Sequence, residues 1–269
     1  MKQASFSAQT LTLSVLTAVF AWCVLQTGSA VPARSFLLQG LPMALGLMFI
    51  IALLERAEQG ANLFSGNKLR SRVACGLLAF WFGWEAVETF RQAQEICWEN
   101  FSSMAVLGLL PLLLWAGWKL EPGVLARSAP ILCWAAVLAG LFCLLGLRGQ
   151  LRWENLLPST TSQTPTLPLY AEYFALPLFC PAKQARRAVW LPVKAFLLAG
   201  GFALGMELVF GAGSPLPGVE LLRAGNRLDA VVLLVWLTVA LFRICVLVQV
   251  VRQLAGWACH GTQSVEENA

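Results

Sequence analysis

Charged residues are scarce in this chain of 269 residues, at 12% of the total, and histidine occurs only once. A soluble domain usually carries about 25% charged residues. The sequence also lacks a CxxC pair, a nucleophile elbow, a GxGxxG or Walker motif and an HExxH motif. We therefore expect no enzyme activity, no catalytic residue, no cofactor and no metal site. The composition likewise excludes an ordinary soluble enzyme, a disordered chain and a nucleic-acid-binding protein.

Hydrophobic residues make up 58% of the chain and fall into long runs. A membrane-spanning helix needs roughly 20 apolar residues. The sequence therefore predicts an all-α polytopic membrane protein of about eight spans, with a single integral membrane domain over residues 1–257 and a polar cytoplasmic tail over 258–269. The predicted spans are Leu11–Leu25, Phe36–Leu54, Val73–Ile96, Met104–Trp118, Ala129–Leu147, Leu167–Cys180, Val189–Phe210 and Leu228–Val250.

Two of these segments are unusual. The first could instead be a secretory signal peptide with a cleavage site at Gly28-Ser29-Ala30, but Lys2 is its only basic residue, which favours a retained helix. The sixth segment contains Pro168 and Pro177. Proline lacks a backbone N–H and disrupts a helix interior, so we expect a broken or short helix between Pro165 and Pro181 whose polar backbone lines a cavity.

The basic residues of the loops predict the orientation of the chain in the cell membrane. If all eight segments cross and the N-terminus is cytoplasmic, 11 Lys and Arg residues lie inside and 5 outside. If the sixth segment does not cross, the split becomes 9 to 7. Because cytoplasmic loops carry an excess of Lys and Arg, we expect eight crossings and cytoplasmic termini.

The third predicted span carries a polar stripe at helical spacing, made of Glu85, Glu88, Gln92, Glu95 and Glu99. At 100° per residue these side chains fall within about 80° of one face. A carboxylate in the middle of a span is costly and marks a functional site by default. The stripe predicts the wall of a cavity that handles cations, protons or an amino group. The alternative is a set of protonated or hydrogen-bonded carboxylates that only hold helices together.

Arg243 lies in the middle of the eighth span and keeps its charge at any biological pH. We expect it to approach Glu85 or Glu88, because an unpaired guanidinium at that depth is costly. The first span carries hydroxyl groups at helical spacing, which serve either helix contact or a pocket: Thr10, Ser14 and Thr17. The candidate ligand-binding residues are Glu85, Glu88, Gln92, Arg243 and Thr17.

Three stretches of the chain are similar to one known family. Trp153–Pro158 (WENLLP) resembles an ENLLP segment that follows the fifth helix in that family. Pro217–Asp229 (PGVELLRAGNRLD) and Val235–Cys245 (VWLTVALFRIC) resemble the segment leading into the eighth helix and the helix itself. The region from about Val73 to Gly256 thus looks like the B-subunit (permease-like) family of endospore germinant receptors, in the amino acid–polyamine–organocation superfamily.

The resemblance implies a LeuT-like scaffold of two inverted five-helix repeats. Its ligand lies at the bilayer midplane between discontinuous helices one and six and the scaffold helices three and eight. This sequence departs from the family in two respects. A polar tail follows the eighth span, which leaves the inverted repeat incomplete, and the first span has no glycine-bearing interruption.

The leading functional prediction is a membrane subunit of a germinant-sensing receptor that binds a small amino-acid-like ligand near the midplane. The family resemblance places such a subunit in the spore inner membrane and implies A- and C-type receptor subunits as partners. One alternative is a secondary transporter for amino acids or cations. The second alternative is a non-transporting structural membrane protein with a degenerate fold.

The charge distribution generates a topology prediction. The loops Glu55–Arg72 and Ala182–Arg187 hold seven of the 11 basic residues assigned to the cytoplasm. Cysteines introduced by Ser65→Cys and Gln184→Cys should therefore escape an impermeant thiol reagent added to intact cells. Labelling of both positions from outside would contradict the predicted orientation.

Overall fold

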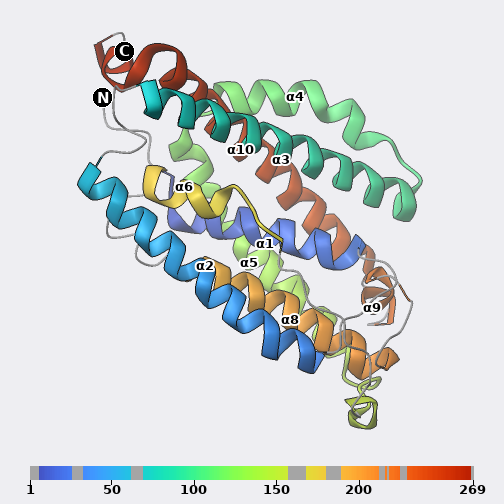
Figure 1. The fold of residues 1–269 in the computed structure, drawn as a ribbon. Coiled ribbons are helices and arrows are strands. Elements are labelled where there is room, and N and C mark those ends of the chain that lie inside the picture. The colour runs from blue at the N-terminus through green and yellow to red at the C-terminus, as the bar shows by residue number, and fades with distance from the viewer. Residues whose placement is uncertain are drawn as a thin grey trace.

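The computed structural model describes residues 6–25, 33–61, 69–156, 168–179, 189–211, 216, 218–224 and 229–267. Within these residues the chain forms helices and no strand, so the predicted all-α membrane fold is confirmed (Figure 1). The longer helices are α1 (Ala8–Leu25), α2 (Ala33–Ala61), α3 (Leu69–Phe101), α4 (Ala105–Lys119), α5 (Pro122–Leu147), α8 (Leu191–Phe210) and α10 (Asp229–Glu267). Short helices are η1 (Trp153–Leu156), α6 (Glu172–Phe179) and α9 (Val219–Ala224).

Six described helices are long and apolar enough to cross a membrane: α1, α2 as far as Arg56, α3, α5, α8 and α10 as far as Cys259. The fourth predicted span is the 15-residue helix α4, which is about 22 Å long. Large apolar side chains such as Leu37, Phe80, Trp115 and Leu144 are exposed on the outside of the bundle. Exposed apolar patches of this extent need an apolar surrounding, and a lipid bilayer provides it.

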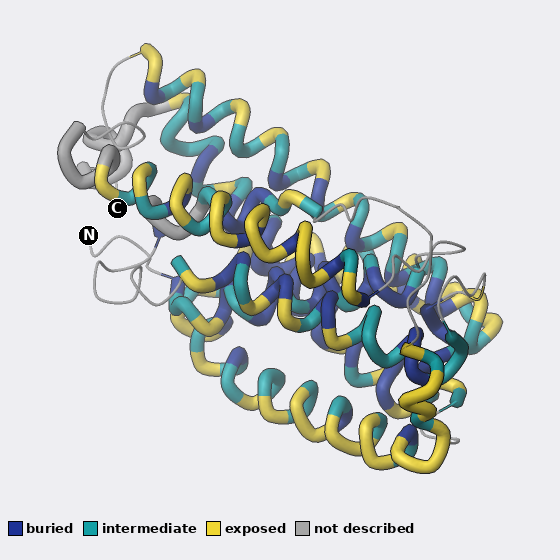
Figure 2. The backbone as a smooth tube through the Cα atoms, turned by 60° about the horizontal axis from the view of Figure 1, so that its bottom comes forward, coloured by how far each residue is buried: buried dark blue, intermediate teal, exposed yellow. Residues whose placement is uncertain are grey.

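The centre of the bundle is built on α10 and α1. Helix α10 packs most extensively along α3 and also contacts α4, α5 and α1, whereas α1 contacts α8, α10, α5 and α6. Between Val232 and Leu254, α10 is apolar on nearly all sides, as expected of a helix that is surrounded by others. Figure 2 shows the buried positions gathered toward the middle of the bundle and the exposed positions on its outward faces.

The sixth predicted span is a short helix, as expected, but Pro177 lies inside this helix and does not end it. Helix α6 has eight residues, about 12 Å of helix, and the residues from Pro168 to Tyr170 before it are not helical. The helix continues through Pro177 for two further residues. It packs against α2 and α1 inside the bundle. Pro165 and Pro181, the expected limits of this segment, lie outside the described residues, as do Ser65 and Gln184.

The contacts of the described pieces between α5 and α8 place them at opposite ends of the bundle. After α5, the Arg152 backbone N–H donates a hydrogen bond of 3.0 Å to the Leu208 carbonyl, near the end of α8. At the other end, the Phe179 carbonyl accepts a 3.0 Å hydrogen bond from the Phe6 N–H. The Phe179 ring stacks on the Trp257 ring, with 5.4 Å between the ring centroids. Phe6 and Trp257 therefore lie at the same end of the bundle.

A buried carboxylate fixes the start of α2. Glu207 is 5% exposed, and its Oε2 accepts a 2.7 Å hydrogen bond from the backbone N–H of Ala33, the first residue of the helix. The first N–H groups of a helix have no partner within the helix and carry partial positive charge. Glu207 therefore ties the C-terminal part of α8 to the N-terminus of α2.

The contact between α4 and α10 gives a stability prediction. A Cβ added at Gly117 would lie 2.8 Å from the Val248 Cβ and 3.1 Å from the Cys245 carbonyl oxygen. Gly117→Ala should therefore push the two helices apart and cost about 1–3 kcal/mol of unfolding free energy. Gly108→Ala in the same helix is the control, because no atom lies within 4 Å of its added Cβ. Equal thermal midpoints of the two purified variants would contradict the close packing.

Candidate functional site

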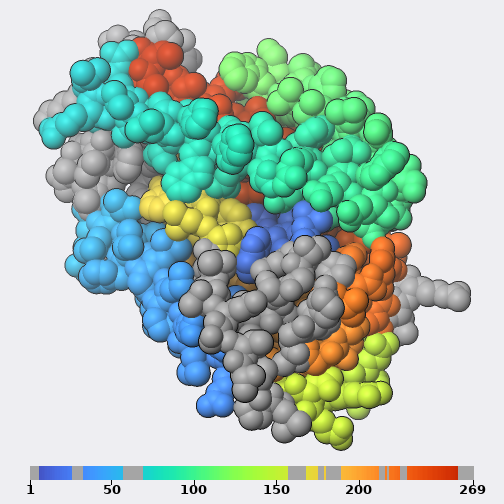
Figure 3. Space-filling view, turned by 45° about the vertical axis from the view of Figure 1, so that its right-hand side comes forward, coloured from blue at the N-terminus to red at the C-terminus, as the bar shows by residue number. Residues whose placement is uncertain are grey.

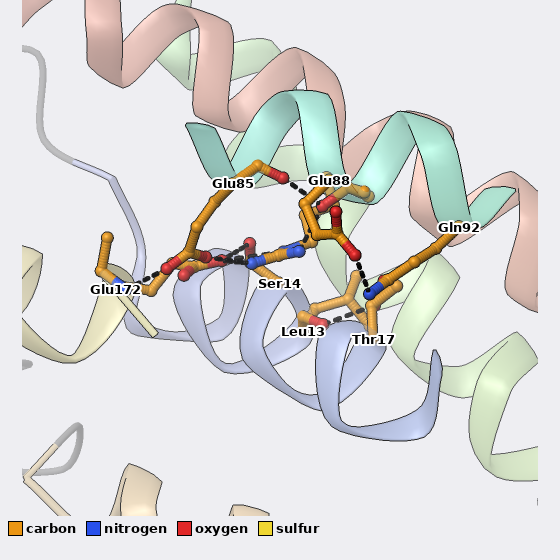
Figure 4. A network of polar contacts seen from close by, with 10 residues as sticks. Leu13, Ser14, Thr17, Glu85, Glu88, Gln92 and Glu172 are labelled. Carbon is orange, nitrogen blue, oxygen red and sulfur yellow. Dashed lines mark hydrogen bonds and ion pairs between the residues drawn. The ribbon is translucent and has the colours of Figure 1, made fainter. Parts of the chain in front are cut away.

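Three buried charges meet in the middle of the bundle, where the side chains of α3, α6 and α10 converge (Figure 4). Arg243 Nη2 lies 2.5 Å from Glu85 Oε2 and 2.7 Å from Glu172 Oε1. Arg243 Nε donates a further hydrogen bond of 2.8 Å to Glu172 Oε1. The three residues are 2%, 7% and 0% exposed for Arg243, Glu85 and Glu172 respectively. We call this group of three residues the charge triad.

Hydroxyl groups from α1 and α3 complete the triad. Arg243 Nη1 donates to the Thr89 hydroxyl, which in turn donates a 2.7 Å bond to the Glu85 carbonyl one turn earlier in α3. On the other side, the Ser14 hydroxyl of α1 donates a 2.8 Å bond to Glu172 Oε1. Both Thr89 and Ser14 are buried. Four helices therefore contribute side chains to one connected polar network in an apolar bundle.

The short helix α6 begins at the triad. Glu172 is its first residue, and the N-terminal turn of a helix favours a negative charge. The preceding N–H, that of Ala171, donates a 2.5 Å hydrogen bond to Glu85 Oε1. The Tyr170 ring lies over the guanidinium, with Arg243 Cζ 5.6 Å from the ring centroid. Because the chain is not yet helical at Tyr170 and Ala171, a backbone N–H is free to bind the carboxylate of another helix.

The expected approach of Arg243 to Glu85 is confirmed, and its approach to Glu88 is not. Glu88 forms an ion pair of 2.8 Å with Arg91 in the next turn of α3 and accepts a 3.1 Å hydrogen bond from Gln92 Nε2. The Glu88 side chain is 35% exposed and that of Arg91 is 65% exposed. Figure 4 shows Glu88 and Gln92 on the side of α3 that faces α1. They lie beside the triad without bonding to Arg243.

Thr17 is also near the triad but outside it. Its hydroxyl donates a 2.7 Å bond to the Leu13 carbonyl in its own helix, and its carbonyl accepts a 3.0 Å bond from Trp236 Nε1. Of the three hydroxyl residues that the sequence placed at helical spacing in the first span, Ser14 contributes to the network. Thr10 bonds instead to Ser7 at the beginning of α1, with 2.8 Å between the two hydroxyl oxygens.

The polar stripe that the sequence predicts on α3 does not coincide with the face that α3 buries. The residues that α3 buries next to the triad are Phe82, Glu85, Thr89, Ala93 and Ile96. On a helical wheel, the centre of these buried residues is rotated about 80° from the centre of the predicted stripe. The buried residues lie on the side of α3 that α10 covers. Glu85 belongs to both sets. The remaining members of the stripe are partly or fully exposed.

Glu172 is the functional candidate that the sequence analysis missed. It follows an apolar stretch and lies between Pro168 and Pro177, so a test of helical spacing does not single it out. The signal that was available is its position: a carboxylate inside an apolar membrane segment is costly wherever it occurs. Thr89, four residues after Glu85, could have been found by its place one helical turn away on the same face.

No family model, curated protein or solved structure matches this chain. The helices and the site alone define its class, which is an all-α polytopic membrane protein. Its most distinctive feature among the described residues is the charge triad, because intramembrane ionisable residues are rare and mark functional sites by default.

The triad predicts a specific pattern of mutational coupling. Arg243→Leu should lower the unfolding free energy by about 3–5 kcal/mol, because it leaves two buried carboxylates without their cation. Adding Glu85→Gln should restore part of that loss, since it removes one of the stranded charges. Glu88→Gln is the matched control and should restore nothing, because Glu88 pairs with Arg91. Thermal unfolding of the purified variants measures the double-mutant cycle, and zero coupling with Glu85 would contradict the ion pair.

Proposed function

We propose that the chain is a membrane subunit of a germinant-sensing receptor that binds a small amino-acid-like ligand between α1, α3, α6 and α10. The observation that supports this proposal is the set of segments that contribute side chains to the polar network. Its side chains come from the first, third, sixth and eighth apolar segments, as Ser14, Glu85, Glu172 and Arg243. These are the four segments that surround the ligand in the fold implied by the resemblance to the receptor B-subunits.

The edge of α3 offers groups for such a ligand. Arg243 is occupied by the carboxylates of the triad, and therefore a ligand carboxylate would have to displace one of them. Glu88 and Gln92, by contrast, are only partly buried and point toward α1. Figure 3 shows part of α1 at the surface between α3 and α6. We propose that the ammonium group of the ligand binds at Glu88 and Gln92, next to the triad.

The wider assignment follows the same resemblance. A subunit of this kind would reside in the spore inner membrane, with both termini cytoplasmic, and would pass the signal to A- and C-type receptor subunits. The location of Phe6 and Trp257 at one end of the bundle supports an even number of crossings.

A secondary transporter for amino acids or cations is the second candidate. The observation in its favour is the presence of buried carboxylates in the middle of a membrane bundle, because transporters use such groups to couple ions or protons to substrate movement. Counterflow of radiolabelled amino acids in liposomes distinguishes the two candidates. A transporter accumulates the label against a preloaded pool, and a receptor subunit does not.

Ligand binding gives the direct test of the proposed function. Titrating the purified protein with each common amino acid should raise its thermal midpoint for at least one of them, by an amount that corresponds to about 2.7 kcal/mol at 100 times the dissociation constant. Glu88→Gln should weaken this stabilisation. Glu220→Gln is the matched control, because Glu220 also pairs with an arginine three residues later, at 2.5 Å, and is 31% exposed. A midpoint that no amino acid raises would contradict the proposal.

A further inference from the structure

The charge triad is not electrically balanced if all its groups are ionised. Two carboxylates, Glu85 and Glu172, face one guanidinium, Arg243, which leaves one excess negative charge. The three side chains are between 0% and 9% exposed. A buried charge without compensation costs several kcal/mol, because water no longer solvates it. The site therefore requires one further positive charge.

Hydrogen-bond accounting points to the place for that charge. Glu85 Oε1 accepts from the Ala171 N–H and Glu85 Oε2 from Arg243. Glu172 Oε1 accepts from Ser14 and Arg243. Glu172 Oε2 is buried and has no hydrogen-bond partner among the residues that the structure describes, although the rest of the network is well satisfied. An unpartnered buried carboxylate oxygen is expensive and needs an explanation.

A proton fits this oxygen better than a metal ion does. A metal cation replaces its hydration shell with several oxygen ligands at once, whereas the triad offers one oxygen that is not already used. The donor groups of Arg243 would also repel a second cation at this distance. A proton needs a single oxygen. Once bound, it removes the excess charge and leaves one ionised carboxylate to balance Arg243.

We propose that Glu85 and Glu172 together hold one proton at neutral pH, which makes the charge triad a proton-binding site. The proton comes from a hydronium ion of the solvent: one of its O–H bonds breaks as the O–H bond to a carboxylate oxygen forms, and a water molecule is left. Glu85 Oε2 and Glu172 Oε1 both contact Arg243 Nη2, at 2.5 Å and 2.7 Å. These two oxygens are therefore at most 5.2 Å apart. Groups this close titrate as a pair, and the proton belongs to the pair.

The surroundings of the pair contain few other ionisable groups. The hydrogen bonds and ion pairs of Glu172 in the described part of the chain connect it to Ser14 of α1 and Arg243 of α10. The Tyr170 ring covers the Arg243 guanidinium. The Tyr173 ring lies next to the Tyr170 ring, with 5.9 Å between the two centroids. Cys23 of α1 packs in the same apolar cluster as Tyr173. Arg243 is therefore the cation that faces the pair, and it cannot give up its own proton.

Infrared spectroscopy of the reconstituted protein tests the proposal without any ligand, so its outcome is separate from that of the proposed function. At neutral pH, the wild type should show the C=O stretch of a protonated carboxyl group, shifted in D2O. Both Glu85→Gln and Glu172→Gln should remove this band, because either change leaves one carboxylate, which ionises beside Arg243. Glu88→Gln should keep it, since Glu88 lies outside the triad and pairs with Arg91.

The pH dependence of stability provides a second measurement. The folded chain holds a proton that the unfolded chain releases at neutral pH, so the thermal midpoint of the wild type should fall as the pH rises through the titration of the pair. Glu85→Gln and Glu172→Gln should lose this fall, and Glu88→Gln should retain it. If one of the two triad variants does not fold, comparing the pH dependence of the wild type with that of the other variant still tests the proposal.

Two results would overturn the proposal. The first is a wild-type spectrum without a protonated carboxyl band, or with a band that neither triad variant affects. The second is a saturable rise in the thermal midpoint on addition of NaCl, compared with choline chloride, that Glu172→Gln abolishes. In that case a metal cation, and not a proton, supplies the missing positive charge.

Discussion

The need to neutralise Arg243 is the constraint on which the rest of the structure depends. A guanidinium stays charged at any biological pH, so a helix that carries one into the middle of a membrane must find carboxylates in other elements. Here they come from α3 and α6, at 2.5 Å and 2.7 Å from the same nitrogen. Apolar packing between membrane helices is weakly specific, because lipid is as apolar as leucine. The triad therefore fixes the register of α10 against α3 more strictly than their apolar contacts do.

The same constraint explains why α6 is short and begins where it does. A continuous helix through Ala171 would use that N–H in its own backbone, and Glu85 would lose the hydrogen bond that Ala171 donates. Irregular backbone within a membrane protein is tolerated where other protein groups satisfy it. Glu85 satisfies it here, and Glu172 in turn places its carboxylate on Arg243. The break in the sixth segment and the charge pair of the third and eighth segments are thus parts of one arrangement.

Periodicity and charge predicted much of this structure, and their failures have physical reasons. Long apolar runs defined the membrane helices. The cost of an unpaired Arg243 predicted an ion pair with Glu85 or Glu88, and Glu85 is the residue that forms it. The burial of α3 could not be read in the same way, because its inward side is set by the contact with α10 and is not centred on the polar stripe. The sequence did not indicate Glu172, because a short helix between prolines has too few residues to show a helical period. Only the position of this carboxylate inside an apolar membrane segment could have indicated it.

The accessible polar groups of the site lie beside its charged centre. Every donor nitrogen of Arg243 is already bonded, and both carboxylates of the triad are buried. Glu88 and Gln92 are only partly buried and lie at the side of α3 that faces α1. Glu88 and Glu85 are three residues apart on one helix, so a displacement of α3 that accommodates a ligand at Glu88 also moves Glu85 relative to Arg243. Because α6 is held to the triad through Ala171 and Glu172, such a displacement reaches three helices at once. A small ligand bound as proposed above would therefore alter the contacts of α3, α6 and α10 together.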